Sequence, residues 1–180
     1  NAKLRIQQGK GSYISRNGNW TREGIIYIPK EKPKLVRNSP ILYSAEEATQ
    51  SHRDGNEFYL TQEQIDSALE DSVDFPQKHI EIPTNRFSEE ELTIFAFGGE
   101  KEAKAYGEFL REAGINKMPV YVVNKDYVNK QDRPFAKQIW FWNLDGRSEL
   151  GGNGRDGRVL HYDDWLRGVK IGAEGTAPIK

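Results

Sequence analysis

The sequence predicts an α+β fold, and the order of its segments carries that prediction. Short strand-like segments come first, helical segments gather in the middle of the chain, and mixed strands return toward the C-terminus. Separate runs of strands and helices favour α+β over a doubly wound sheet. We expect the 180 residues to form one domain, 1–180, because 8 Phe, 8 Tyr and 4 Trp provide the side chains of a sizeable core.

The N-terminal region is predicted to form a β-hairpin. Residues 13–16 and a run ending at 25–28 are rich in aromatic and β-branched residues, and the turn residues 17–19 separate them. The Pro- and Lys-rich segment 29–34 is a candidate linker. Residues 1–2, Asn-Ala, are typical of the remainder of a cleaved expression tag, so the fold prediction leaves them out.

The first central helix is predicted at about residues 61–72. The Thr61 hydroxyl can cap its first turn, and Gln64, three residues later, completes a capping box. Leu60 and Ile65 stand at the two positions of a hydrophobic staple. This combination predicts both the helix and its first residue.

Residues 92–97 can be interpreted in two ways, as a buried strand or as a helix. Ser88 and Glu91 repeat the capping signature, whereas the β-branched and aromatic residues of the run individually favour a strand. We give the start signal more weight than the propensities and predict a helix at about 89–97. Gly98 is then its C-terminal cap.

A third helix is predicted at about residues 100–113, because apolar residues recur on one side of it and a glycine follows. The segment 136–144 has large apolar groups on both faces, which indicates a central strand. Three further strands are predicted, at 79–82, 119–123 and 158–162. The first of them lies between two prolines, which is typical of an edge strand.

Charge is distributed unevenly along the chain, although the formal net charge is −1. Residues 1–37 hold nine Lys and Arg against two Glu, and residues 44–91 hold three basic against thirteen acidic residues. Either the basic segment forms an exposed face for a partner, or the two segments neutralise each other in the fold. Cysteine is absent, which excludes disulfides and thiolate chemistry. The cellular compartment stays unknown, because reducing and oxidising compartments both permit a protein without cysteine.

The basic segment offers a candidate nucleic-acid surface. Its cations alternate with aromatic residues, a composition that can pair phosphates with positive charge and bases with rings. The residues that we predict for this role are Arg16, Trp20, Arg22 and Lys34. If the acidic segment covers them, the surface is structural instead.

The loop-rich segment 143–165 is a candidate hydrolase site, because it brings His161 near Asp163 and Asp164 in the sequence. A solvated surface histidine is the competing interpretation. Trp140 and Trp142 share one face of a strand and would stack on a planar ligand if exposed, or pack in the core if not. No metal site and no cofactor are predicted, since a single calcium-repeat-like motif at 151–156 cannot build a stacked site.

The absence of a convergent nucleophile, acid-base or metal pattern favours a binding or interaction module over an enzyme. Its partner, a protein or a small ligand, is not identified by the sequence. A nucleic-acid-binding protein and a hydrolase-type enzyme are the alternatives. No apolar run approaches the length of a bilayer span, so no membrane-spanning segment is expected.

Overall fold

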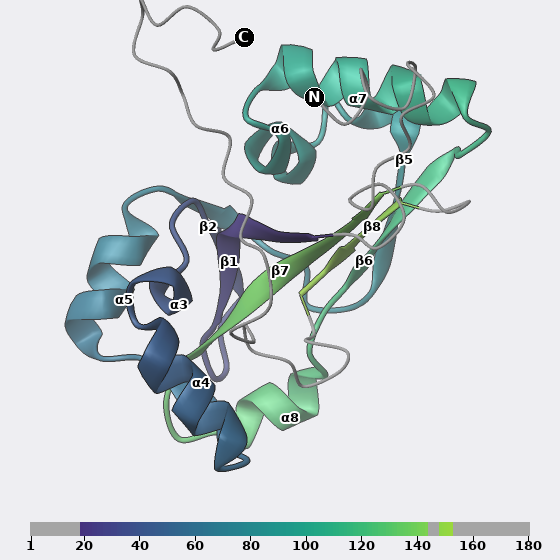
Figure 1. Ribbon diagram of the computed structural model, residues 1–180. Coiled ribbons are helices and arrows are strands. Elements are labelled where there is room, and N and C mark those ends of the chain that lie inside the picture. The colour runs from purple at the N-terminus through teal and green to yellow at the C-terminus, as the bar shows by residue number, and fades with distance from the viewer. Residues whose placement is uncertain (1–18, 144–147, 153–180) are drawn as a thin grey trace, which may run out of the picture.

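The computed structural model describes residues 19–143 and 148–152, in which helices pack on both faces of a mixed sheet (Figure 1). The described strands are β1 (Asn19–Tyr27), β2 (Lys34–Val36), β3 (Phe58–Tyr59), β4 (Ser72–Asp74), β5 (Ile80–Pro83), β6 (Lys117–Tyr121), β7 (Phe135–Asn143) and β8 (Ser148–Gly151). The described helices are α3 (Pro40–Tyr43), α4 (Ala45–Arg53), α5 (Gln62–Leu69), α6 (Glu91–Phe97), α7 (Glu100–Glu112) and α8 (Lys125–Asn129), with a 3₁₀ turn at Thr84–Arg86. These helices and the mixed sheet confirm the α+β prediction. None of the described helices has the length and apolar character needed to cross a membrane.

The strands follow the order β4-β2-β1-β7-β8-β6-β5, and β3 adds to the end of β7. The β6–β8 pair is parallel and the other described pairs are antiparallel. As predicted, β7 lies centrally, between β1 and β8, and β5 lies at an edge. The C-terminal strands are mixed in direction, also as predicted.

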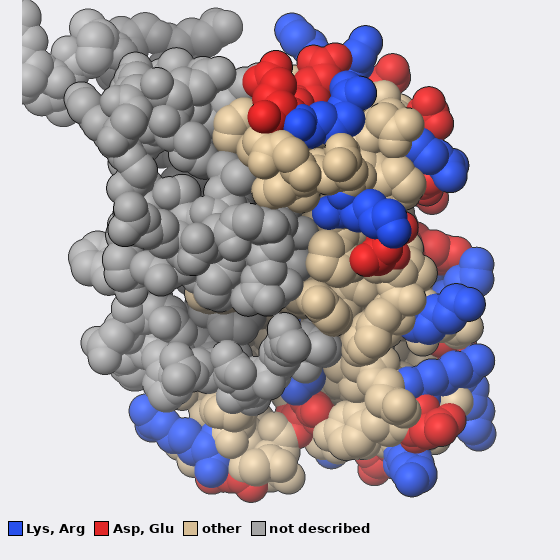
Figure 2. Space-filling model, turned by 90° about the vertical axis from the view of Figure 1, so that its right-hand side faces the viewer, with Lys and Arg blue, Asp and Glu red and all other residues tan. Residues whose placement is uncertain are grey.

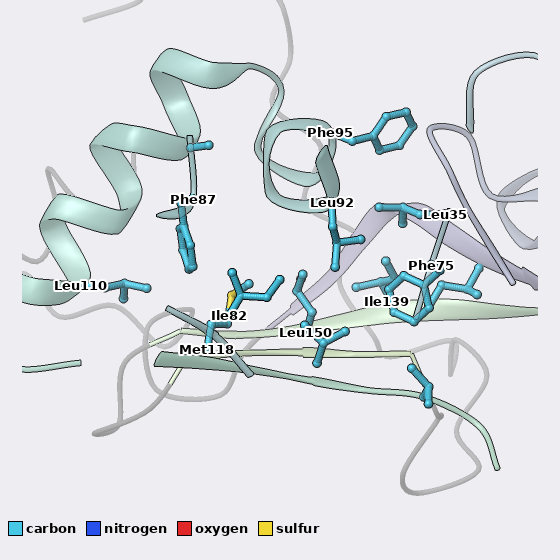
Figure 3. Close-up of a cluster of buried hydrophobic side chains, with 14 of the residues drawn as sticks. Leu35, Phe75, Ile82, Phe87, Leu92, Phe95, Leu110, Met118, Ile139 and Leu150 are labelled. Atoms are coloured by element: carbon cyan, nitrogen blue, oxygen red, sulfur yellow. The ribbon is translucent and has the colours of Figure 1, made fainter. Parts of the chain in front are cut away.

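Both faces of the sheet are buried, and alternate residues of β7 show how. Phe135 and Ile139 belong to a larger core cluster, whereas Ala136 and Trp140 belong to or pack on a smaller one. In Figure 3, Leu92 of α6 points toward the strands that carry Ile139 and Leu150. Successive side chains of β7 therefore point to opposite faces of the sheet and pack in two separate clusters.

The smaller cluster is covered by α3, α4 and α5. Ile41 of α3, Ala48 of α4 and Ile65 of α5 are buried there against Ile26 of β1 and Val36 of β2. Figure 1 shows these three helices beside one end of the sheet, away from α6 and α7. The two helical groups thus stabilise opposite faces by apolar burial.

The helical interpretation of residues 92–97 is confirmed, but the predicted start is wrong. The N-cap is Glu90, not Ser88, and no side-chain cap is formed. The N–H groups of Glu89 and Glu90 both donate to the carbonyl of Arg86, so Ser88 lies inside a preceding turn. Gly98 ends the helix in the left-handed region at φ 86°, as predicted.

The N-terminal hairpin also differs from the prediction. Asn19, expected in a turn, begins β1, and the hairpin that the structure describes joins β1 to β2 through residues 28–33. The predicted arm 13–16 lies outside the described residues. The supposed linker 29–34 is therefore this turn and the first residue of β2.

Two other boundaries shift. Helix α5 ends at Leu69 rather than near 72, because β4 begins at Ser72 and pairs with β2. Strand β6 spans Lys117–Tyr121 rather than the predicted 119–123. The predicted strand at 158–162 lies outside the described residues.

Candidate ligand-binding groove

A surface groove of about 570 Å³ lies beside the end of β6. Two segments line it, residues 77–79 before β5 and residues 122–127, which run from the end of β6 into α8. We call it the β6 groove. The antiparallel pairing of β5 with β6, in which Ile80 faces Val120, brings the two segments together.

The floor of the β6 groove is fixed by Tyr27, which is fully buried. Its hydroxyl accepts a hydrogen bond from the Val123 N–H at 3.1 Å and donates one to the Gly152 carbonyl at 3.0 Å. Burial raises the pKa of the Tyr27 phenol above its usual range, although the Val123 N–H acts in the opposite direction. A neutral phenol thus ties the end of β6 to β1 and to the residue after β8.

His79 supports the wall beside Val122. Its Nδ1 atom accepts a hydrogen bond from the Val122 N–H at 3.0 Å, and its ring meets Tyr121 edge-on with centroids 5.4 Å apart. Because Nδ1 is the acceptor, the neutral ring carries its hydrogen on Nε2. His79 is exposed, so this second nitrogen is the donor that it offers to solvent or a ligand.

The opposite wall is α8, which is capped and anchored. Asn124 Oδ1 accepts from the N–H groups of Asp126 at 2.8 Å and Tyr127 at 3.3 Å. The Tyr127 hydroxyl donates to Glu57 Oε1 at 2.7 Å, and Glu57 Oε2 lies 2.5 Å from Lys137 Nζ. Desolvation, with help from the Glu57 carboxylate, raises the pKa of Tyr127 to about 12.

The charged side chains of the groove contrast with this anchoring. Lys78, Lys125 and Asp126 line it and are exposed, and none of the three has an ion pair within the described ranges. The backbone of the β6 groove is therefore held by hydrogen bonds to side chains, from the buried Tyr27 to the exposed His79, whereas its charged groups have no ion-pair partner among the described residues.

A second groove, of about 340 Å³, lies between α3 and α5. Its lining mixes polar and apolar residues, namely Asn38, Pro40, Tyr43, Ser44, Glu63, Gln64, Ser67 and Ala68. Tyr43 is 76% exposed at this site. We call it the α3–α5 groove.

The predicted nucleic-acid residues do not form an open basic surface in the part of the chain that is described. Lys34 Nζ pairs with Asp74 Oδ1 at 2.7 Å, and Arg22 Nε donates to Asn38 Oδ1 at 2.5 Å. Only the backbone of Trp20 is described, in β1, and Arg16 lies outside the described residues. On the face that Figure 2 shows, basic and acidic side chains are interspersed rather than separated by sign.

The predicted stacking and catalytic residues are placed only in part. Trp140 is partly buried and packs on the smaller core cluster, so core packing explains it better than a stacking platform. For Trp142 the backbone alone is described, paired with Glu149. His161, Asp163 and Asp164 lie outside the described residues, and the hydrolase hypothesis stays a prediction. Among the described residues, no group of three or more His, Asp or Glu could hold a metal ion.

Sequence reasoning missed every residue of the β6 groove as a site. His79 was assigned only to an edge strand, and Tyr127 had no predicted role. One local signal was present, since Asn124 follows the predicted strand 119–123 and is a favoured N-cap. The rest of the groove depends on the β5–β6 pairing, which joins positions about 40 residues apart in the chain and leaves no local pattern in the sequence.

Comparison with known proteins gives a likeness in structure alone. No protein-family model matches the sequence, and no curated protein matches it. A solved structure from work on how the C-type lectin fold accommodates massive sequence variation in Nanoarchaeota is similar, with a TM-score of 0.61 and 19% identity. The match covers 84% of this chain and 77% of that one. At this identity the likeness concerns the fold, and the chain shares the α+β architecture of the C-type lectin fold.

Proposed function

We propose that this protein is a binding module and that the β6 groove holds its ligand. The observation that carries the proposal is the contrast between walls held by hydrogen bonds and charged side chains that have no ion pair among the described residues. Three side chains from outside residues 122–127, Tyr27, His79 and Glu57, bind and position that segment. A site whose walls are already in place loses little conformational freedom on binding, which favours affinity.

The same contacts favour binding over catalysis in the β6 groove. His79 uses one ring nitrogen as a structural acceptor, so the atom that the neutral ring offers to a ligand is a hydrogen-bond donor, Nε2–H. Tyr127, with a pKa raised to about 12, is poorly matched to acid-base work near neutral pH. The likeness to the C-type lectin fold identifies no site, because one fold can carry unrelated sites, so the proposal rests on the contacts of the β6 groove.

The test is a ligand screen read by two-dimensional amide NMR, using mixtures of sugars, short peptides, nucleotides and small organic acids. We expect saturable shifts confined to residues 77–80 and 122–127. Shifts confined to the α3–α5 groove, around Tyr43 and Ala68, would place the site elsewhere and contradict the proposal. Turnover of any probe during the screen would contradict the non-catalytic part.

The two alternative functions keep their own tests. The described cations Arg22 and Lys34 have polar or acidic partners and give nucleic-acid binding no support. Salt-dependent binding of labelled oligonucleotides that is lost in Arg16→Glu would support the nucleic-acid-binding hypothesis. Hydrolase activity that is lost in His161→Ala or Asp163→Ala would support the enzyme hypothesis.

A further inference from the structure

We propose that the β6 groove recognises its ligand through a single oxyanion group, a carboxylate or a phosphate monoester. This inference rests on the proposed function and names the chemistry of the ligand. It follows from the kinds of hydrogen-bond donor that line the groove and from the one carboxylate among them.

The first donor is the Nε2–H group of His79. The Val122 N–H occupies Nδ1, which fixes the tautomer of the neutral ring and keeps a donor on Nε2. An acceptor on the ligand suits this position better than a donor does. The edge-on contact with Tyr121 also holds the ring orientation.

The next two donors are the ammonium groups of Lys78 and Lys125. Several other lysines in the described structure already face a carboxylate, as Lys117 does with Glu81 and Lys137 with Glu57. Lys78 and Lys125 have no such partner within the described ranges. They come from the two separate segments that line the groove, so an anion between the segments can draw on both.

Asp126 limits how much negative charge the ligand can carry. Its carboxylate lines the same groove, leaving a balance of one positive charge from Lys78, Lys125 and Asp126. A polyanion would be repelled by Asp126, whereas a carboxylate, with its single negative charge, matches the balance. A phosphate monoester carries about −1.5 to −2 near pH 7, so the carboxylate fits this balance more closely. The groove therefore favours a small acid over a nucleic acid or a polyphosphate.

The experiment uses three defined probes with the whole chain at low ionic strength, followed by amide NMR. N-acetylglycine supplies a carboxylate, methyl phosphate supplies a phosphate monoester, and N-acetylglycinamide is the uncharged match of the first. We expect saturable shifts at residues 78–79 and 122–127 with one or both anions and none with the amide. Whichever anion binds more tightly identifies the source of the oxyanion.

Variants separate recognition from folding. Lys78→Ala with Lys125→Ala should weaken binding about tenfold or more, because the double variant removes both positive charges that line the groove. His79→Asn should also weaken binding of the anion, because it removes the Nε2–H donor. The amide oxygen of the new side chain can still accept the hydrogen bond from the Val122 N–H. The matched control removes two exposed lysines from α7, as Lys101→Ala with Lys104→Ala, and should leave the affinity unchanged.

The outcomes distinguish this inference from the proposed function. Equal binding of N-acetylglycine and its amide at the groove would overturn anion recognition and leave the binding module intact. Equal weakening by the α7 control would reduce the effect to overall charge and overturn the inference too. No shift with any of the three probes would overturn it as well, and the broader screen then decides whether the groove binds anything.

Discussion

Gly24 of β1 packs directly against Ser39, in the segment that leads into α3. A methyl group on Gly24 would clash with Ser39 Oγ and lie 2.6 Å from Ser39 Cβ. Ser39 is fully buried, and Gln138, opposite Gly24 on β7, donates to the carbonyls of Thr21 and Glu23 where the register of β1 shifts. The close approach of Ser39 therefore leaves no room for a side chain at position 24.

We expect Gly24→Ala to lower the free energy of unfolding by about 1–3 kcal/mol, because the added methyl group overpacks this contact. Adding Ser39→Gly removes the clashing atoms and should restore part of the loss. Urea unfolding of the two single variants and the double variant measures the coupling. Strict additivity would contradict the contact as the cause.

Tyr27 offers a second test at the level of one atom. Tyr27→Phe deletes the hydroxyl that joins the Val123 N–H to the Gly152 carbonyl, leaving one half-buried and one buried polar group without this partner. We expect a loss of about 1–3 kcal/mol in the free energy of unfolding. Tyr43→Phe, at a side chain that is 76% exposed, is the matched control and should change little. Similar values for the two variants would contradict a structural role for the Tyr27 hydroxyl.

Tyr127 predicts a pH effect at the alkaline end. Its pKa is raised from 10.0 to about 12 in the folded protein. Since the folded state holds this proton more tightly than the unfolded state, its contribution is complete below about pH 10 and is lost as the pH rises toward 12. The stability difference between wild type and Tyr127→Phe should therefore shrink over pH 10–12. A difference that stays constant across this range in urea unfolding would contradict the assignment.

At the scale of elements, two helices with the same start signature behave differently. In α5 the Gln64 N–H donates to Thr61 Oγ1 at 3.2 Å, and the Thr61 N–H donates to Gln64 Oε1 at 2.9 Å. Before α6, Phe87 is fully buried and Arg86 pairs with Glu89 and Glu90, so the chain turns ahead of the helix. Tertiary packing therefore overrides the capping signal at Ser88.

This difference predicts unequal costs for two similar substitutions. Thr61→Ala should lower the free energy of unfolding by about 1 kcal/mol, because an N-cap bond is lost. Ser88→Ala should cost much less, since Ser88 caps no helix. Chemical denaturation of both variants in the same buffer makes the comparison. A larger loss in Ser88→Ala than in Thr61→Ala would show that Ser88 stabilises the turn by another route.

The sequence predicted those elements whose signals are local. Helix α7 has a complete apolar stripe and a glycine stop, and β7 has large apolar groups on both faces, so both were found. Short elements such as α3, of four residues, and β3, of two, were missed because their pairing or packing partners lie far away in the chain. The β6 groove was missed for the same reason, since β5–β6 pairing assembles it.

At the scale of the whole molecule, the uneven charge along the sequence is partly neutralised by the sheet. The β2–β4 pairing places Lys34 opposite Asp74, and Lys32 reaches the same carboxylate. Arg37 lies 3.6 Å from Asp71 and also donates to the Phe95 carbonyl at the end of α6. Within the described residues, the basic segment therefore meets part of the acidic one, which was one of the two alternatives open from the sequence.

Asp74 makes this neutralisation measurable. Hydrogen bonds from Lys32 and then Lys34 lower the pKa of Asp74 from 3.8 to about 2. Because the folded pKa is depressed, the stabilising contribution is present above about pH 4 and is lost as the pH falls toward 2. In an NMR titration of the side-chain carboxyl, Lys32→Ala with Lys34→Ala should return the pKa toward its ordinary value. Lys30→Ala, which removes a neighbouring exposed cation, should leave it low. If the control raised the pKa as much as the double variant, the general field of the basic segment, rather than these two contacts, would hold Asp74 ionised.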